Sequence, residues 1–532
     1  MTAGRVSRLL VVSLAALLAA CGSSSKSSSG IQTLADGNYV FHLAGTDYNT
    51  SQQFSSPYFV AGAFTVSKGL ITQGEEDFVD YKNVFATVAI DPSGSSIGTT
   101  ADGNLQIKFY TGGSGQAFLG INGTQTINAS LVSSTSARIE EFDGSASGTG
   151  SLDMQSSVAQ PSGSYAFFAA GLDTKDLPMA LGGIINIDNL NGTTGTISGA
   201  GSIFDLNDAP TLGVFPAQTF APSTVSAPDS FGRVVFTLNP TNGAIGAINL
   251  VGYVVSSTTI QLAETTDGVL GTLGGAALGQ SSQGTFNPAG LTYVFDSRGQ
   301  EQVGGAFATG SGYLNFAGAL AFNSSAGVGG QVSFNDIATQ VDNGSTNTAS
   351  YAPDSIHAGR VSVTGLTTSD PSTPANLEFY LDGNGNGFVV SMDASDVTAG
   401  TAFQQASNPS VSGTYVLTAR GTTLITSDNL TVTYPWSALG LVSASSGKAT
   451  GFTDLNVLTN PEVTGTLATN VSLTGTSTGT GGVMTGAIGG LGYASTSNQY
   501  AYYVIDNNRA LAIETDANQL SEAFAVVTSA TK

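Results

Sequence analysis

The sequence is short of the residues on which much protein chemistry depends. Its 532 residues include one cysteine and two histidines, and charged residues make up only 10% of the chain. A single cysteine excludes an intramolecular disulfide. With so few histidines and thiols, a zinc or other transition-metal site built from nitrogen and sulfur ligands is nearly excluded as well.

Positive charge is scarcer than negative charge. The chain has 15 Lys and Arg against 37 Asp and Glu, for a net charge of −22. This charge disfavours nucleic acid and anionic membrane surfaces as partners. In place of charge there are 69 glycines, about twice the usual share, which is typical of extracellular β-structure with many turns. With 41% hydrophobic residues the chain has enough apolar material to build cores.

The N-terminus has the three regions of a signal peptide. Arg5 and Arg8 precede an apolar run, residues 9–18, and small residues follow it. The run is too short to cross a hydrocarbon core, which needs about 20 residues. We therefore expect residues 1–20 to be a processing signal.

The segment Leu18-Ala19-Ala20-Cys21 resembles the lipobox of bacterial lipoproteins. The resemblance implies cleavage before Cys21, addition of a diacylglycerol to its thiol and acylation of its new amino group, for example with palmitate. Residues 21–33 then hold the lipidated Cys21 and a Ser/Gly-rich tether. Because Gly22 rather than Asp follows the cysteine, the family's sorting rule implies the outer membrane.

Behind the anchor one pattern occurs four times. Each copy opens with a strand that carries a tyrosine, and the spacings between these tyrosines are 126, 128 and 122 residues: Tyr39, Tyr165, Tyr293 and Tyr415. An acidic residue follows 99 to 102 residues later: Glu141, Glu264, Asp393 and Glu514. A second acidic residue follows closely in each copy: Asp143, Asp267, Asp396 and Asp516. The first three copies close on a glutamine: Gln155, Gln280 and Gln404.

These landmarks predict four β-domains in tandem, with the boundaries 34–157, 158–285, 286–408 and 409–532. Apolar residues alternate with period two inside each copy, and turn-forming residues recur every eight to twelve positions, so the fold class is all-β. We expect each domain to be an antiparallel up-and-down β-barrel, with an immunoglobulin-like sandwich as the alternative. The domains can form a rod or a compact cluster. A shorter match between the second and third copies, Gly232-Arg233 and Gly359-Arg360, supports this alignment of the repeats.

One loop has the spacing of a calcium site. Asp382, Asn384, Asn386 and Asp393 stand at loop positions 1, 3, 5 and 12, with Gly387 at position 6. The loop resembles that of an EF-hand or a dockerin. The flanking segments are typical of strands rather than helices, which favours a glycine-rich hairpin over calcium. No other cofactor is expected.

The remaining candidates have simple structural interpretations. His42 alternates with aromatic residues and is expected to be a partly exposed strand residue. The cluster Glu75–Asp77 with Asp80 is interpreted as a solvated loop. The repeated acidic pairs are interpreted as turn residues, since aspartate accepts hydrogen bonds from its own turn backbone.

Beyond the lipobox, the chain resembles exported lipoproteins with tandem β-repeats, a resemblance that implies no particular activity. We expect a non-enzymatic structural, adhesive or binding protein that is anchored to the membrane through its lipid. Its possible partners are a cell-envelope glycan or a surface protein, and not nucleic acid. The alternative is an envelope-associated, carbohydrate-active hydrolase that uses a carboxylate pair.

Overall fold

The computed structural model describes residues 33–529 apart from several short internal gaps: 50–53, 81–82, 101–102, 113–119, 265–270, 308–311, 337–340, 368–374, 428–429, 459–465, 481, 493–497 and 517–518. The expected signal peptide and the lipidation site Cys21 lie outside the described residues, as does Asp267. Within the described part of the chain, no helix has the length and hydrophobicity needed to span a membrane.

The first domain is a single antiparallel sheet that curls around its own core. Its strands are β1 (Gly37–Asn49), β2 (Phe54–Ser67), β3 (Leu70–Asp80), β4 (Asn83–Ala89), β5 (Ser96–Thr99), β6 (Leu105–Tyr110), β7 (Thr124–Ser133), β8 (Ser136–Glu141) and β9 (Ala146–Met154). The order in the sheet is β4-β3-β2-β1-β9-β8-β7-β6-β5. The first and last strands therefore lie side by side in the middle of the sheet.

The second domain closes on itself, because its first strand pairs with both its second and its last. Its strands are β10 (Gly163–Leu172), β11 (Pro178–Asp188), β12 (Thr194–Ile197), β13 (Ile203–Asp208), β14 (Gly213–Gln218), β15 (Ser223–Ser226), β16 (Arg233–Leu238), β17 (Ile248–Ser256), β18 (Thr259–Glu264) and β19 (Thr272–Gly279). Strand β11 pairs with β12 at one end and with β13 at the other, so the β13–β14 hairpin departs from a strict up-and-down order.

The third and fourth domains are closed barrels whose strands follow chain order. The third contains β20 (Thr292–Glu301), β21 (Tyr313–Phe322), β22 (Gly327–Asn335), β23 (Val341–Pro353), β24 (Arg360–Leu366), β25 (Ala375–Leu381), β26 (Asn386–Ser391) and β27 (Asp396–Gln404). The fourth contains β28 (Gly413–Ser427), β29 (Leu430–Ser445), β30 (Lys448–Val457), β31 (Thr466–Thr480), β32 (Val483–Gly489), β33 (Asn498–Val504), β34 (Arg509–Glu514) and β35 (Gln519–Val527). The prediction of all-β domains built as antiparallel barrels is confirmed.

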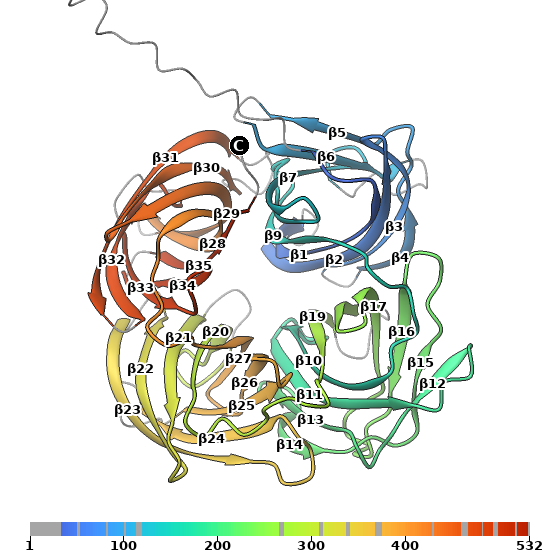
Figure 1. Cartoon of the computed structure of the whole chain (residues 1–532), viewed down its shortest axis with the longest axis vertical. Helices are drawn as coiled ribbons and strands as arrows, with labels where there is room; N and C mark the ends of the chain where they lie inside the picture. Colours follow the sequence, from blue (N-terminus) through green and yellow to red (C-terminus); the bar gives the residue numbers. More distant parts are fainter. Residues whose placement is uncertain are drawn as a thin grey trace, which may run out of the picture.

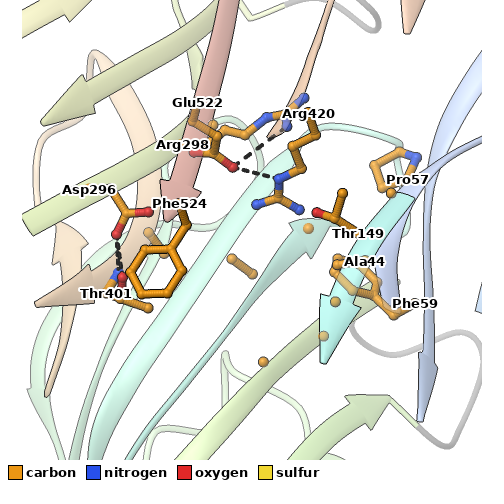
Figure 2. A pocket seen from close by; sticks show the side chains of 18 of the residues that line it. Ala44, Pro57, Phe59, Thr149, Asp296, Arg298, Thr401, Arg420, Glu522 and Phe524 are labelled. Carbon is orange, nitrogen blue, oxygen red and sulfur yellow. Dashed lines mark hydrogen bonds and ion pairs between the residues drawn. The ribbon is translucent and has the colours of Figure 1, made fainter. Parts of the chain in front are cut away.

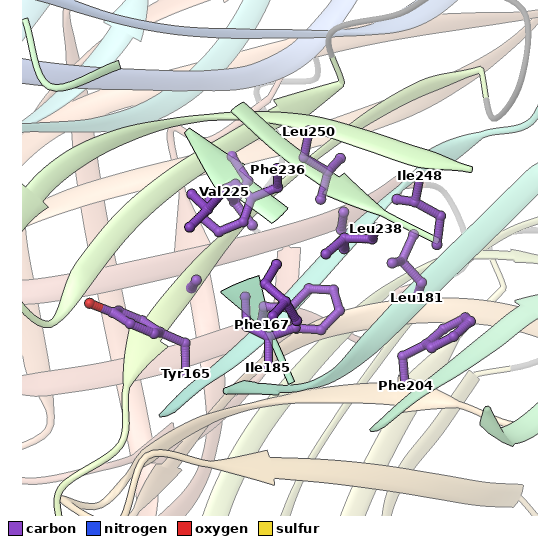
Figure 3. Close-up of a cluster of buried hydrophobic side chains, with 14 of the residues drawn as sticks. Tyr165, Phe167, Leu181, Ile185, Phe204, Val225, Phe236, Leu238, Ile248 and Leu250 are labelled. Carbon is purple, nitrogen blue, oxygen red and sulfur yellow. The ribbon is translucent and has the colours of Figure 1, made fainter. Parts of the chain in front are cut away.

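Each barrel is organised around the tyrosine of its first strand. Because side chains alternate across a strand, this tyrosine and the aromatic or leucine residue two positions later both point into the core. All four tyrosines are at most 2% exposed: Tyr39, Tyr165, Tyr293 and Tyr415. In the second domain, Tyr165 and Phe167 pack with Phe236 and Leu250 (Figure 3). The outward positions of the same strands are left for contacts between domains.

The four domains form a closed ring, in which the fourth returns to contact the first (Figure 1). The Thr528 hydroxyl, just after β35, donates to the backbone oxygen of Leu131 on β7 at 2.8 Å. The Ser437 hydroxyl on β29 donates to Glu140 on β8 at 2.9 Å. The arrangement is therefore a compact cluster and not a rod.

Apolar clusters join the domains that are consecutive in sequence. Val40 and Ala61 of the first domain pack with Tyr253 of the second, and Ala166 of the second packs with Tyr380 of the third. Val294 of the third domain packs with Tyr503 of the fourth. These outer barrel faces are buried in the ring, which explains why the strands carry apolar residues on both sides.

Candidate functional site

The first interface, between the first and second domains, contains a buried ion pair. Arg233 at the start of β16 donates from Nε and Nη2 to the Asp77 carboxylate on β3, at 2.7 and 2.8 Å. The Tyr253 hydroxyl on β17 donates to the same carboxylate at 2.6 Å. Asp77 is 1% exposed. This bidentate geometry fixes how the two barrels meet.

The second interface, between the second and third domains, repeats the contact. Asp205 on β13 accepts from Arg360 at 2.8 and 2.7 Å and from the Tyr380 hydroxyl at 2.8 Å. Glu378 lies 3.0 Å from the same guanidinium. Burial, with the charge of Asp205 and against that of Arg360, raises the pKa of Glu378 to about 7.

The third interface, between the third and fourth domains, keeps the tyrosine contact but has no arginine and aspartate at the equivalent positions. Val483 follows Gly482 as Arg233 follows Gly232, so a valine stands in the arginine's place. Opposite it, the Tyr503 hydroxyl donates to Ser333 on β22 at 2.7 Å.

At the closing interface, between the fourth and first domains, amides replace arginine. Asp454 on β30 accepts from the side-chain amides of Asn104 and Asn128, at 3.0 and 2.9 Å. Glu140 is completely buried in the same interface. Its pKa lies well above the ordinary value because of burial, reinforced by Asp454 and opposed by the hydrogen bond from Ser437.

A second device recurs at three interfaces. Two residues after the interface aspartate or serine, an asparagine donates its amide to backbone oxygens in the turn between the last two strands of the next domain. Its acceptors are the backbone oxygens of residues 391, 393 and 396 for Asn207, of 514, 516 and 519 for Asn335, and of 141 and 146 for Asn456. The first domain has Val79 in this position.

A glutamine at the end of each of the first three domains ties it to the next. Its side-chain amide donates to two backbone oxygens beside a glycine with positive φ, and the glutamines are Gln155, Gln280 and Gln405. A Cβ on Gly359 would lie 2.4 Å from Nε2 of Gln280, so the glutamine needs the glycine. The residue predicted to close the third copy, Gln404, is wrong by one position: its neighbour Gln405 donates to the Val504 oxygen at 2.7 Å.

At the centre of the ring all four domains line one cavity, with a volume of about 470 Å³. The charged and titratable side chains that line it are His42, Arg138, Asp296, Arg298, Tyr313, Arg420 and Glu522. His42 and Arg298 come from the first strands of their barrels, at outward positions that alternate with the core residues. The cavity is within the size range of small-molecule sites.

Glu522 connects two of the arginines in this cavity. Its carboxylate accepts from Arg420 Nε at 2.5 Å and lies 3.8 Å from Arg298 Nη1 (Figure 2). Arg420 and Glu522 are direct partners across β28 and β35. Burial alone would raise the pKa of Glu522, but the two guanidinium groups hold it below its ordinary value.

Asp296 is held separately from this network. It accepts the backbone N–H of Thr401 at 3.0 Å and also the Thr401 hydroxyl. Burial, and then the charge of Glu522, raises the pKa of Asp296 to about 6. Arg138 stacks over the Phe524 ring, 4.9 Å from its centroid. The carboxylates of the cavity are thus engaged by the protein itself.

No family model and no curated protein matches this chain. Among solved structures, transferrin-binding protein B from Haemophilus parasuis aligns over 94% of this chain and 97% of its own, with 9% identity and a TM-score of 0.19. The same protein from Neisseria meningitidis aligns over 92% of this chain and 100% of its own, with 9% identity and a TM-score of 0.18. With TM-scores this low, these structures do not indicate the fold or the function of this chain.

The structure separates the residues of the candidate calcium loop. Asp382 accepts from the backbone N–H groups of Asn384 and Asn386 in the β25–β26 hairpin, at 2.7 and 2.9 Å. Asp393 lies beyond the other end of β26 and accepts from the backbone and side chain of Asn376. Among the described residues, no group of three or more His, Cys, Asp or Glu side chains is arranged to hold a metal ion. Calcium binding at this loop stays a prediction.

The acidic landmarks fall into two kinds of position. Asp143, Asp393 and Asp516 are equivalent. Each follows the end of a strand and accepts a backbone N–H near the start of the strand paired with it: Thr126 of β7, Asn376 of β25 and Gln499 of β33. The other position lies inside the barrels, where Glu141, Glu264 and Glu514 are buried and Ser391 takes the place of the glutamate. In the third copy, Asp393 therefore does not belong to the first acidic position, as predicted, but to the second, two residues further on. The turn interpretation describes Asp143, which accepts the backbone N–H of Ser145 in its own turn. It does not describe the bonds of Asp393 and Asp516 to a neighbouring strand, or the buried glutamates.

The interpretation of Glu75–Asp77 as a solvated loop is wrong. These residues lie in β3, where Glu76 and Asp77 are at most 1% exposed. His42 lines the cavity as a partly buried strand residue, as expected. Sequence reasoning missed Arg298, Arg420 and Glu522. A signal existed, since Arg298 and Arg420 stand five residues after their tyrosines, where the first two copies have Ala44 and Ala170.

Proposed function

We propose that this chain is a lipid-anchored, non-enzymatic binding protein of the cell envelope, and that it holds one small ligand in the cavity at the centre of the ring. The observation that carries the proposal is that all four domains contribute side chains to a single cavity. Independent modules would each present their own site and gain through avidity. A shared cavity instead gives one site for each chain.

The test compares ligand binding by the mature protein and a variant with a filled cavity. Small molecules, glycan fragments and peptidoglycan fragments from the envelope are screened, and the stoichiometry of each hit is measured by calorimetry. We expect one ligand per chain, and loss of binding in Ala170→Trp, whose side chain enters the cavity. Leu70→Trp, at an outer turn where Leu70 is 64% exposed, is the matched control. Binding that survives in both variants, or several ligands per chain, would contradict the proposal.

The anchor is a separate part of the proposal. It rests on Cys21 and its lipobox, and the favoured location is the outer membrane. Acyl chains contribute about 0.8 kcal/mol for each buried CH₂, so several of them hold a protein on a membrane without a spanning helix. Cys21→Ser should move the protein from the membrane fraction to the soluble exported fraction. A mutant that stays with the membranes would remove the lipidation claim.

The hydrolase alternative has one observation in its favour. Asp296 and Glu522 line the same cavity with pKa values shifted in opposite directions, the pattern expected of an acid and a base. Against it, Thr401 donates hydrogen bonds to Asp296, and two arginines form ion pairs with Glu522. Hydrolysis of a polysaccharide or peptide that is abolished by Asp296→Asn would establish the enzyme in place of the binding protein.

A further inference from the structure

The charges in the cavity do not balance. Three arginines, Arg138, Arg298 and Arg420, line it together with two carboxylates, Asp296 and Glu522. The whole chain carries a net charge of −22, so an excess of positive charge is unusual at its centre. Charge that is enclosed by protein acts more strongly on a ligand than charge at the surface.

Of the two arginines beside Glu522, Arg298 has its positive charge less well compensated by that carboxylate. Its Nη1 is 3.8 Å from Glu522, whereas Arg420 Nε is 2.5 Å from the same oxygen. Burial, and then the nearby charge of Arg420, lowers the pKa of Arg298 to about 10. An added anion between the two guanidinium groups would relieve this repulsion.

His42 supplies an independent observation. It lines the cavity from β1, and its Nε2 is buried without a hydrogen-bond partner among the described residues. A buried polar atom without a partner is unfavourable, because it has lost its hydrogen bonds to water. Burial, and then the charge of Arg420, lowers its pKa to about 4, so the ring is neutral and Nε2 can serve a ligand as donor or acceptor.

Much of the remaining wall is apolar. Phe59 of the first domain, Phe168 of the second and Phe388 of the third line the cavity. The rings of Phe168 and Phe388 lie 4.6 Å apart between centroids. Figure 2 shows Phe59 and Pro57 across the cavity from Glu522 and Arg298. A ligand that fills this space therefore has the arginines on one side and Phe59 on the other, with Phe524 among the charged groups.

We infer that the cavity binds an amphipathic anion, with a carboxylate or phosphate group on Arg298 and Arg420 and an apolar body against Phe59, Phe168 and Phe388. The inference rests on the proposed function and names the class of ligand for that same cavity. Arginine suits both kinds of anion because its planar group donates two parallel hydrogen bonds.

The test uses probes that share one ten-carbon chain and differ in the charge of the head group. Decanoate, decyl phosphate, decanol and decyltrimethylammonium are titrated into the full mature protein by calorimetry, below their micelle-forming concentrations. We expect decanoate or decyl phosphate to bind once per chain, decanol at least tenfold more weakly, and the cation not at all. The first two probes distinguish a fatty-acid-like ligand from a phosphate-bearing one.

The variants locate the head group. Arg298→Gln leaves Glu522 paired with Arg420 and should weaken the anion at least tenfold, while decanol binding stays unchanged. Arg298→Lys keeps the charge and should recover part of the affinity. Lys448→Gln removes an exposed charge outside the cavity and should change nothing. Circular dichroism and melting of each variant check that it folds.

Three results would overturn the inference. They are equal affinity for decanol and decanoate, unchanged anion binding in Arg298→Gln, and no binding of any probe. If a neutral ligand still binds once per chain and Ala170→Trp removes it, the proposed function stands and the anionic class is wrong. If the anion binds several times per chain, both fail.

Discussion

The second interface and the closing interface have the same geometry but different chemistry. At the second, Asp205 is held by Arg360 and Tyr380, and the chain itself links the two barrels. At the closing interface no linker joins the barrels, and Asp454 meets two amides instead of a guanidinium. At the second interface the linker already keeps the two barrels together, so the buried ion pair mainly fixes their orientation. At the closing interface, which has no linker, neutral amides donate the hydrogen bonds to the buried carboxylate.

The largest effect is expected when the arginine of the second interface is removed. Arg360→Met leaves Asp205 and Glu378 buried without their cation, so we expect the free energy of unfolding to fall by about 3–5 kcal/mol. Urea unfolding followed by circular dichroism measures the loss. The control copies the third interface, with Arg360→Val, Asp205→Ser and Glu378→Ala combined, and should be close to the wild type. A triple variant as unstable as the single one would show that the ion pair itself stabilises the ring.

A smaller effect is expected from the asparagine amides. Asn456→Ala removes two 2.7 Å hydrogen bonds at the closing interface and should cost about 1–3 kcal/mol. Asn207→Ala removes three equivalent hydrogen bonds at the second interface, where the linker holds the barrels together. Hydrogen exchange of the turn at 141–146 should therefore accelerate in Asn456→Ala more than the equivalent turn does in Asn207→Ala. Equal acceleration would mean that the linker contributes nothing to ring closure.

The tyrosines allow a finer comparison of charged and neutral interfaces. Tyr253→Phe removes a hydrogen bond to the Asp77 carboxylate and should cost about 1.5–3 kcal/mol. Tyr503→Phe removes a hydrogen bond to a serine hydroxyl and should cost about 1 kcal/mol. Thermal melting of the two variants beside the wild type measures the difference, and the reverse order would contradict the assignment.

The smallest expected effect is on how protein stability varies with pH, and it comes from Glu140 at the closing interface. The folded-state pKa of Glu140 is raised above its ordinary 4.5 by burial and, secondarily, by Asp454, so above pH 4.5 the folded protein keeps a proton that the unfolded chain has released. Its contribution to stability is therefore greatest below pH 4.5 and is lost as the pH rises toward the folded pKa. Glu140→Gln should melt like the wild type at pH 4 and above it at pH 8. Parallel pH profiles would show that Glu140 does not titrate there.

Local patterns were enough to predict the barrels. The tyrosines at 39, 165, 293 and 415 and the period-two alternation are properties of single strands, and they determine which side chains enter each core. The same patterns failed where two barrels share a surface. Asp77 looks like a solvent-facing residue because nothing nearby in the sequence shows that Arg233, 156 residues later, covers it.

The candidate site was beyond local reasoning for the same reason. Arg298, Arg420 and Glu522 stand on three strands of two barrels, and each alone is an ordinary outward residue. The calcium spacing was visible in the sequence, but a hairpin and one strand place Asp382 and Asp393 at opposite ends of β26. A spacing indicates a site only when the backbone between its members has the conformation that the spacing assumes.

The repeat, the all-β class and the inner face of each barrel thus follow from local sequence, because they depend on alternation along a strand and on turns within a copy. The closure of four barrels into a ring, the meeting of buried charges and the enclosure of one cavity by the outward residues of four first strands follow only from the packing of whole domains. Those outcomes depend on contacts between residues more than 100 positions apart. Such contacts are set by how whole barrels pack and not by the neighbours of any one residue.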